Sequence, residues 1–263
     1  MPSTKLSPNK VNQVSIILPT YNEVGNIADL IEDIHLAVSH PHEIIVVDDN
    51  SPDGTSDLVQ SLISRGSIPG LRLETRMHDR GLTKSIWRGI ELAEGDTVVW
   101  MDCDFSMPPD TIPQLLAKVE EGNDIAVGSR FVSGGSQKEH GTGESHSVIF
   151  LSRLLSFMLR VLLSSKFRDY TSGFIAIRRD VFDQIKLKGD YGEYFIDLIF
   201  RSILLGHSVV EIPYICEPRR SGESKTAPNF PVLIKRGVKY LFVLVKMQIV
   251  RVRHLLGMGI TDL

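Results

Sequence analysis

The chain has 263 residues, of which 42% are hydrophobic and 23% charged, and its formal net charge is −3. This length and composition predict one sizeable α/β domain, or one domain with an appendage, and the small net charge gives no reason to expect a nucleic-acid partner. Two cysteines, Cys103 and Cys216, are too few for a disulfide framework or a cysteine metal site, so we expect a reducing, cytoplasmic location.

Apolar strands alternate with amphipathic helices over the first half of the chain. The predicted strands cover residues 14–18, 43–47, 71–75, 97–101 and 125–127. The predicted helices, recognised by apolar residues three and four apart, lie within 24–38, 55–63, 86–93 and 112–119. Because the connections are short, this alternation predicts a Rossmann-like, mostly parallel sheet with helices on both faces.

Polar residues follow three of these strands. Residues 19–23 come after the first strand, Asp48 and Asp49 after the second, and Asp102 and Asp104 after the fourth. Open α/β sheets bind ligands at the carboxyl ends of their strands, and all three clusters belong to that edge. In an extended backbone Asp102 and Asp104 point to the same side, where their mutual repulsion favours a cation or a metal-bound phosphate between them.

The character of the sequence changes after Ser129. Residues 148–163 are almost wholly apolar but too few to span a bilayer, and a helix under a lid or one lying in the membrane interface both fit. Later strands are predicted over 175–177 and 209–212, with a helix over 193–205 between them. The tail, residues 230–256, combines apolar and basic residues as an interfacial amphipathic helix does, and residues 217–253 contain nine basic and two acidic residues.

Several common catalytic motifs are absent from the sequence. Residues 143–146 resemble a nucleophile elbow but lack its closing glycine and a preceding strand, which argues against a serine hydrolase. The chain has no Walker loop, and no G-x-G-x-x-G follows the first strand, so neither a P-loop NTPase nor a dinucleotide dehydrogenase is favoured. What remains is an acidic, metal-type site with cations at Arg130 and over residues 219–225, the set that a nucleotide-diphosphate substrate needs.

Six segments resemble family 2 glycosyltransferases, in the order typical of that family, and most closely the dolichyl- or polyprenyl-phosphate mannosyltransferase (dolichol-phosphate mannose synthase) branch. They are PTYNE at 19–23, VDDNSPDGT at 47–55, MDCDFSMPP at 101–109, VGSRFVSGG at 127–135, TSGF at 171–174 and RRSGESK at 219–225. The resemblance covers roughly residues 12–227. Its first three segments are shared by the wider family, and its last three are more specific to polyprenyl-phosphate acceptors.

The resemblance implies a GT-A fold and an inverting transfer from a nucleotide sugar. Base and ribose contacts are expected from Pro19, Tyr21, Glu23, Val47 and Asp48. The donor diphosphate is expected to bind Asp102 and Asp104 through Mg²⁺ or Mn²⁺, with Cys103 and Ser106 close by. Phosphate contacts are expected from Arg130, Arg219 and Lys225, and Asp104 and Arg130 are the expected catalytic residues.

The resemblance also implies a division of the chain and a place of action. Residues 1–227 would form the GT-A domain, with a nucleotide-sugar half over 12–128 and an acceptor half over 129–227, and 228–263 would form a basic amphipathic tail. The apolar stretch and this tail are expected to place the enzyme peripherally on the cytosolic face of a membrane. A membrane-anchoring subunit could serve the same purpose.

Departures from the family pattern leave the donor sugar open. Thr83 and Lys84 replace the usual Gly-Thr, Cys103 replaces Ala, Asp197 stands where Glu is common, and residues 137–147 lack the expected Trp. Fold-level analogy favours GDP-mannose over UDP-glucose. One alternative is transfer to a carbohydrate hydroxyl, which needs a general base such as Asp197, and another is a non-catalytic nucleotide-sugar-binding subunit.

Overall fold

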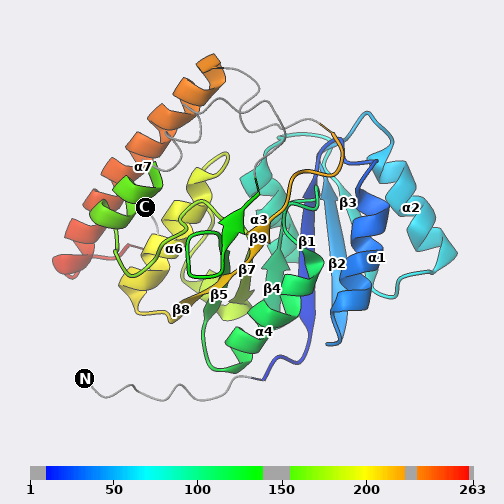
Figure 1. The fold of residues 1–263 in the computed structure, drawn as a ribbon, viewed down its shortest axis with the longest axis horizontal. Coiled ribbons are helices and arrows are strands. Elements are labelled where there is room, and N and C mark those ends of the chain that lie inside the picture. Colours follow the sequence, from blue (N-terminus) through cyan, green and yellow to red (C-terminus); the bar gives the residue numbers. More distant parts are fainter. Residues whose placement is uncertain (1–9, 139–154, 223–229, 261–263) are drawn as a thin grey trace.

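The computed structural model describes residues 10–138, 155–222 and 230–260 (Figure 1). A seven-stranded sheet in the order β3-β2-β1-β4-β7-β5-β8 forms its centre. The strands of this sheet are β1 (Val14–Thr20), β2 (His42–Asp48), β3 (Leu71–Thr75), β4 (Thr97–Trp100), β5 (Ile125–Ser129), β7 (Ile175–Arg178) and β8 (Val209–Pro213). A second, two-stranded sheet consists of β6 (Ser136–Gln137) and β9 (Ile215–Cys216).

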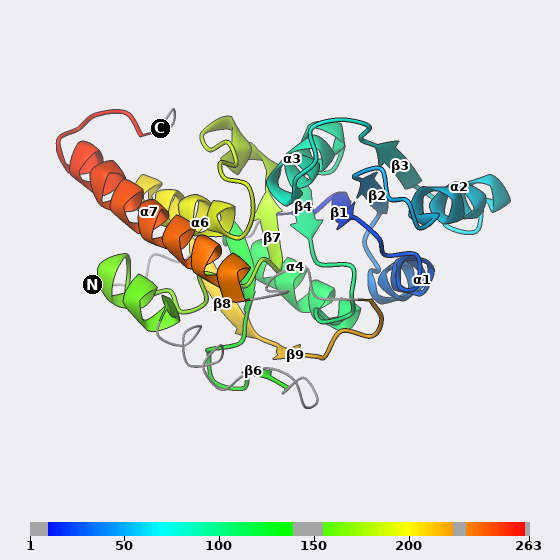
Figure 2. The same cartoon turned by 90° about the horizontal axis from the view of Figure 1, so that it is seen from above.

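Helices cover both faces of the large sheet, as the two views show (Figures 1 and 2). The α-helices are α1 (Ile27–Ala37), α2 (Thr55–Arg65), α3 (Leu82–Leu92), α4 (Ile112–Glu120), α6 (Glu193–Leu205) and α7 (Phe230–Leu255). Two short 3₁₀ helices are η1 (Pro109–Thr111) and η2 (Arg179–Asp183). Residues 155–162 are also helical, whereas the rest of the predicted apolar helix, 148–154, lies outside the described residues.

The sheet is mostly parallel, as predicted, with one exception. Strands β1, β2, β3 and β4 pair in parallel, and so do β5 and β8. Strand β7 runs antiparallel between β4 and β5. Because β7 comes from residues after 129 and completes a sheet begun before 128, the sheet is continuous across the predicted boundary between the two halves, and that division stays a prediction.

Alternating side chains of each strand fill two separate cores. Ile17, Ile45 and Val98 face a core shared with α3, α6 and α7. Ile16 and Val99 face the opposite core, shared with α1, α2 and α4. Burial on both faces explains why these strands are continuously apolar rather than alternating in the sequence.

Strand β1 is longer than the sequence predicts. We expected Pro19 to end it at Leu18, but the strand runs through Pro19 to Thr20 and stays in register with β2. On the other side, β4 pairs with β1 only as far as Ile17. Proline lacks a backbone N–H, and here that loss falls beyond the end of β4, where no ladder bond is needed.

The basic tail forms the amphipathic helix α7, as predicted, and packs on α6. Its buried residues Leu244, Met247 and Val250 belong to the core that α6 also lines. Within the described ranges, no helix is both long enough and apolar enough to cross a membrane.

Candidate active site

The carboxyl ends of β1, β2 and β4 lie next to one another and position the first three motifs. Thr20 pairs with Asp48 at the ends of β1 and β2, and Ile17 pairs with Trp100 at the end of β4. The segment that follows β9 crosses the same ends of the strands (Figure 1). Residues from four separate parts of the chain therefore meet at this edge, as the sequence predicts.

The two acids after β4 have different surroundings. The strand ends at Trp100, so residues 102–105 form a turn, with φ +66° at Phe105, rather than the extended segment we expected. Asp104 is 6% exposed, and its Oδ1 accepts a hydrogen bond from the Ser106 N–H at 2.9 Å. Asp102 borders solvent.

Asp102 and Asp104 remain close enough to repel each other. Crowding by protein atoms and the negative charge of Asp104 raise the pKa of Asp102 to about 7. The Asp102 side chain borders solvent, so the repulsion by Asp104 is the cause that a bound cation can relieve. A divalent cation between these carboxylates would reverse the effect by favouring their ionised forms.

This pair fits a metal that arrives with its substrate better than a resident metal. Among the described residues there is no group of three or more His, Cys, Asp or Glu side chains that could enclose a cation. Asp102 and Asp104 supply carboxylate oxygens only. Mg²⁺ in particular is held by one or two carboxylates while substrate phosphates and water complete its coordination, and this donor set suits that arrangement.

Arg219 links the acids of two strand ends. Its Nη2 lies 2.7 Å from Asp104 Oδ2, and its Nη1 donates to Glu23 Oε1 at 3.2 Å. Glu23 follows β1 and is 7% exposed. The three sequence-predicted residues Glu23, Asp104 and Arg219 are thus in direct contact, although Arg219 is 115 positions or more away from both acids.

Backbone contacts hold the segment that carries Arg219 in place. The Arg220 N–H donates to Asp104 O at 3.0 Å, and the Glu217 N–H donates to Ser106 O at 3.0 Å. The guanidinium of Arg220 stacks 3.5 Å from the centre of the Phe105 ring. The predicted cation Lys225, further along the same motif, lies outside the described residues.

The residues predicted to bind the base and ribose differ in accessibility. Val47 is fully buried in the core, so only its backbone can reach a ligand. Asp48 is also fully buried, and its carboxylate accepts hydrogen bonds from Ser51 and Ser56, which order the turn after β2. Direct contact between the Asp48 side chain and a ribose, which we expected, therefore conflicts with this geometry.

The β1 end of the site includes an arginine that the sequence analysis gave no role. Arg80 lies 5.0 Å from the centre of the Tyr21 ring and donates to the Tyr21 hydroxyl at 3.2 Å. Nearby, the Cys103 thiol donates to Pro19 O at 3.5 Å. The planar side chains of Tyr21 and Arg80 are suited to stacking on a base. The sequence feature that could have indicated this role is the position of Arg80 in the loop after β3.

Asp49 fixes that loop. Its Oδ1 accepts hydrogen bonds from Arg76 at 2.7 Å and from Ser85 at 2.8 Å, and its Oδ2 accepts one from the Gly81 N–H at 2.8 Å. Gly81 has φ +152°, a value that glycine adopts without strain. Asp49 therefore positions the beginning of α3 and, with it, Arg80.

Arg130 forms the other side of the site and is bound to a partner that the sequence did not reveal. Its Nε and Nη2 donate to the two oxygens of Asp169 at 2.9 and 2.7 Å, and Nη2 also donates to Thr171 at 2.9 Å. Asp169 is fully buried. Burial alone would lower the pKa of Arg130, but the charge of Asp169 outweighs it and raises that pKa, so the guanidinium stays charged and held in one orientation.

Asp197, the base considered for a carbohydrate acceptor, is 2% exposed in α6. Its carboxylate pairs with Arg201, also buried, and with Lys246 of α7. Burial raises the pKa of Asp197, while the two cations oppose that rise. A carboxylate engaged in this way is poorly placed to accept a proton from a substrate.

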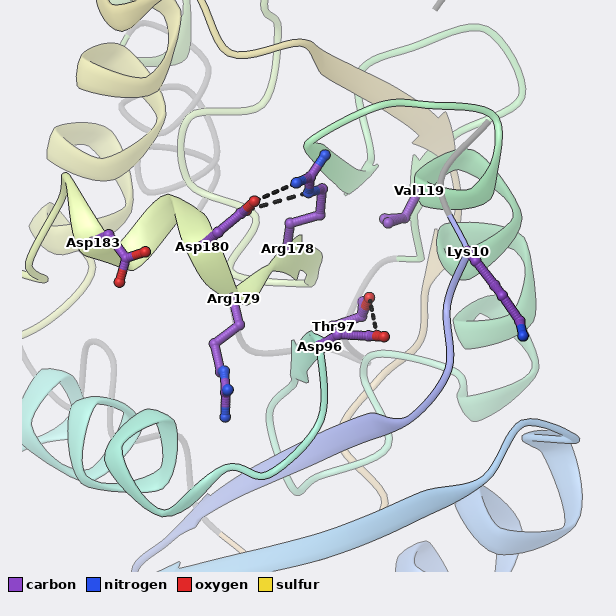
Figure 3. A pocket seen from close by; sticks show the side chains of 8 residues that line it. All are labelled: Lys10, Asp96, Thr97, Val119, Arg178, Arg179, Asp180 and Asp183. Carbon is purple, nitrogen blue, oxygen red and sulfur yellow. Dashed lines mark hydrogen bonds and ion pairs between the residues drawn. The ribbon is translucent and has the colours of Figure 1, made fainter. Parts of the chain in front are cut away.

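A separate pocket lies at the opposite, amino end of β4 (Figure 3). Its volume is about 360 Å³, and its lining includes Asp96, Thr97, Arg178, Arg179 and Asp180. The arginine Arg178 is paired with Asp124 and Asp180. Because it lies at the amino end of β4, this pocket is away from the edge at which open α/β sheets bind their ligands.

Solved structures of similar shape establish the class of fold. Glucosyl-3-phosphoglycerate synthase from Mycobacterium tuberculosis, crystallised with Mn²⁺, UDP and glucosyl-3-phosphoglycerate, superposes with a TM-score of 0.64. The match covers 90% of this chain and 80% of that one, at 20% identity. Together with the mixed sheet, this places the molecule among proteins of the GT-A glycosyltransferase fold.

The sequence comparisons are more specific. The family model described as glycosyl transferase family 2 matches residues 15–186. A dolichol-phosphate mannosyltransferase from Pyrococcus furiosus is 34% identical over 81% of this chain, but the match spans only 59% of that relative. A polyprenol monophosphomannose synthase from Mycolicibacterium smegmatis is 36% identical over 80% of this chain and 79% of its own length. The chain belongs to glycosyl transferase family 2.

Proposed function

We propose that this chain is a metal-dependent, inverting glycosyltransferase that moves mannose from GDP-mannose to a polyprenyl or dolichyl phosphate. The observation that carries the proposal is the contact of Glu23, Asp104 and Arg219 at the carboxyl edge of the sheet. A carboxylate proposed to hold the metal, Asp104, meets there an arginine proposed to bind phosphates, as a nucleotide-diphosphate donor requires. The names of the two curated relatives support mannose as the sugar and a polyprenyl phosphate as the acceptor.

Asp102 and Asp104 would hold Mg²⁺ or Mn²⁺ against the donor diphosphate. The bound metal supplies Lewis-acid stabilisation of the charge that develops on the leaving nucleoside diphosphate. The Ser106 N–H keeps the Asp104 carboxylate in orientation at 2.9 Å. Tyr21 and Arg80 would contact the base, Asp48 would support the turn beside it, and the backbone at Pro19 and Val47 would line the same end of the site.

Arg130 would bring the acceptor phosphate to the donor sugar. A lipid phosphate is already anionic near neutral pH, so its attack on the anomeric carbon needs cations to reduce repulsion rather than a strong general base. The fixed guanidinium of Arg130 meets that need, and Lys225 is proposed to assist it. The burial of Asp197 between Arg201 and Lys246 makes a carbohydrate acceptor the weaker alternative.

The test is a radiolabelled transfer assay with a short polyprenyl phosphate and Mg²⁺ or Mn²⁺. GDP-mannose, UDP-glucose and UDP-N-acetylglucosamine are supplied separately as donors. We expect label to enter the organic phase with GDP-mannose only. Label entering from a uridine donor would overturn the proposed sugar, and donor binding without any transfer would favour a non-catalytic subunit.

The outer face of α7 suits a membrane that contains the lipid acceptor. Exposed apolar residues recur at helical spacing along that face, at Phe242, Val245, Ile249 and Val252, and exposed Leu256 follows directly after the helix. Three basic residues seven apart, Lys239, Lys246 and Arg253, lie along one edge of this stripe, where Lys239 pairs with Asp190 and Lys246 with Asp197. We place the enzyme peripherally on the cytosolic face of an anionic membrane, held by this stripe.

Helical residues 155–162 extend the same surface. They lie beside α7 in both views (Figures 1 and 2), where Gln248 of α7 donates to Leu162 O at 2.9 Å. Phe157 and Val161 of that segment are also exposed. Two neighbouring helices with exposed apolar residues provide a broader membrane-facing surface than α7 alone.

Cosedimentation with vesicles that contain anionic lipid tests this surface. The double variant Phe242→Ser/Ile249→Ser should lose most vesicle binding while transfer to a short, detergent-dispersed acceptor is retained. A matched control is Leu36→Ser, which removes an exposed apolar residue from α1. Equal vesicle binding by wild type and the double variant would instead point to a membrane-anchoring subunit.

A further inference from the structure

Arg219 occupies the position of a counter-cation at the proposed metal site. Its guanidinium contacts Asp104 Oδ2 at 2.7 Å and Glu23 Oε1 at 3.2 Å. The second oxygen of Asp104, Oδ1, accepts the Ser106 N–H. Both oxygens of the carboxylate therefore already have partners in the described part of the chain.

A divalent cation on Asp104 would conflict with this arrangement. Two cations that share one carboxylate repel each other strongly in a partly buried site, and Asp104 and Glu23 are 6% and 7% exposed. The metal can be accommodated without that cost only if the guanidinium moves to another anion. A nucleoside diphosphate brings such an anion, and arginine binds phosphate oxygens in the same bidentate manner as carboxylates.

We propose that Arg219 is an exchangeable counter-cation that couples metal binding to nucleotide binding. This inference rests on the proposed function, because it takes Asp102 and Asp104 as the metal ligands. In the nucleotide-free protein Arg219 neutralises Asp104 and Glu23 and weakens divalent-cation binding. When the diphosphate binds, the guanidinium transfers to its oxygens and releases Asp104 to the metal, so each ligand raises the affinity for the other.

The backbone around Arg219 allows the side chain to move without the loop. The Arg220 N–H is fixed to Asp104 O, and Asn26 Nδ2 donates to Ser221 O at 3.2 Å. On the preceding side the Glu217 N–H donates to Ser106 O, so the backbone on both sides of Arg219 is held against the ends of β1 and β4. Exchange requires only rotation of the Arg219 side chain, which is 19% exposed and so borders solvent.

The experiment measures Mn²⁺ affinity by electron paramagnetic resonance, without nucleotide and with saturating GDP (UDP if GDP does not bind). Arg219→Gln should bind Mn²⁺ about tenfold more tightly than wild type in the absence of nucleotide, within the range typical of coupling between sites. The tightening of Mn²⁺ binding by the nucleotide should be correspondingly smaller in this variant. Arg219→Lys keeps the positive charge but loses the forked guanidinium group, so its Mn²⁺ affinity should lie between those of wild type and Arg219→Gln.

Arg220→Gln is the matched control. It removes the same charge from the neighbouring position, where the side chain stacks on Phe105 and lies 3.7 Å from Asp29 rather than contacting the Asp104 carboxylate. Equal effects of Arg219→Gln and Arg220→Gln, or no gain in nucleotide-free Mn²⁺ affinity for Arg219→Gln, would overturn the exchange. Absence of Mn²⁺ binding in every protein, even with nucleotide, would instead remove the metal site of the proposed function.

Discussion

The two ends of β4 both carry charged clusters, and they differ in how those charges are balanced. At the amino end, Arg178 pairs with Asp124 and with Asp180, and the second of these pairs lines the pocket of Figure 3. At the carboxyl end, Arg219 is shared by two carboxylates while Asp102 borders solvent with a raised pKa. The first end is arranged for the stability of the free protein, and the second retains a demand for further positive charge.

This difference separates a structural cluster from a functional one. Unrelieved repulsion among acids lowers the stability of the free protein, and a ligand that relieves it is bound more tightly for that reason. Charged residues of both signs are present at both ends of β4. The incomplete balance of charge distinguishes the carboxyl end.

The largest expected effect comes from Asp104→Asn. Removing a carboxylate that holds the diphosphate metal should lower transfer activity about a thousandfold, because electrostatic stabilisation of the leaving group of about 4 kcal/mol is lost. The free energy of unfolding should change little, because the relief of repulsion with Asp102 offsets the loss of the ion pair with Arg219. Initial rates of lipid labelling and urea denaturation measure the two quantities.

Asp180→Asn is the matched substitution at the amino end of β4. It removes one carboxylate of the same kind, which is paired with Arg178, and we expect activity within about twofold of wild type, as for most surface changes away from a site. Comparable losses of activity in the two variants would contradict the assignment of function to the carboxyl end.

A smaller effect, measured as a loss of stability, is expected from Asp169→Asn. This change leaves the Arg130 guanidinium with a neutral partner in a buried place, and breaking such a pair costs roughly 3 kcal/mol of unfolding free energy. Urea denaturation provides the measurement. The double variant Arg130→Met/Asp169→Leu, which removes both charges, should be more stable than Asp169→Asn, and failure to recover stability would show that the pair is not the cause.

The smallest effect concerns pH and lies at the amino end of β2. Burial opposes the charge of Glu43, but hydrogen bonds from Ser15, the Glu94 N–H and Arg72 outweigh it and hold the pKa of Glu43 below its ordinary value of 4.5. A carboxyl whose pKa is lower in the folded state stabilises the protein above the unfolded pKa. That contribution is lost as the pH falls through the folded pKa.

Glu43→Gln should therefore make the free energy of unfolding less dependent on pH in the acid range. Between about pH 6 and about pH 3 the variant should lose less unfolding free energy than wild type, although it starts from a lower value because the charged hydrogen bonds are gone. Thermal unfolding followed at several pH values provides the comparison. Parallel curves for the two proteins would mean that another carboxyl governs the acid range.

Much of the candidate site could be predicted because its signals are local. Strand and helix periods place Asp48, Asp102 and Asp104 after strands, and the parallel alternation puts those strand ends on one edge. The partners of these residues could not be predicted. Asp169 lies 39 positions from Arg130 in a loop with no distinguishing pattern. The sequence also did not show that Asp197 is buried between α6 and α7 and is therefore not available as a base.

The sequence by itself determined the family, the alternation of strands and helices, the amphipathic α7 and the acidic character of the carboxyl edge. These follow from side-chain period, turn residues and charge, each of which is a property of neighbouring residues. Only the tertiary structure decided that β7 inserts antiparallel between β4 and β5, that β1 continues through Pro19, and that Arg219 bridges Glu23 and Asp104. Those contacts join distant parts of the chain, and their energies depend on burial and charge pairing that exist only once the sheet has formed.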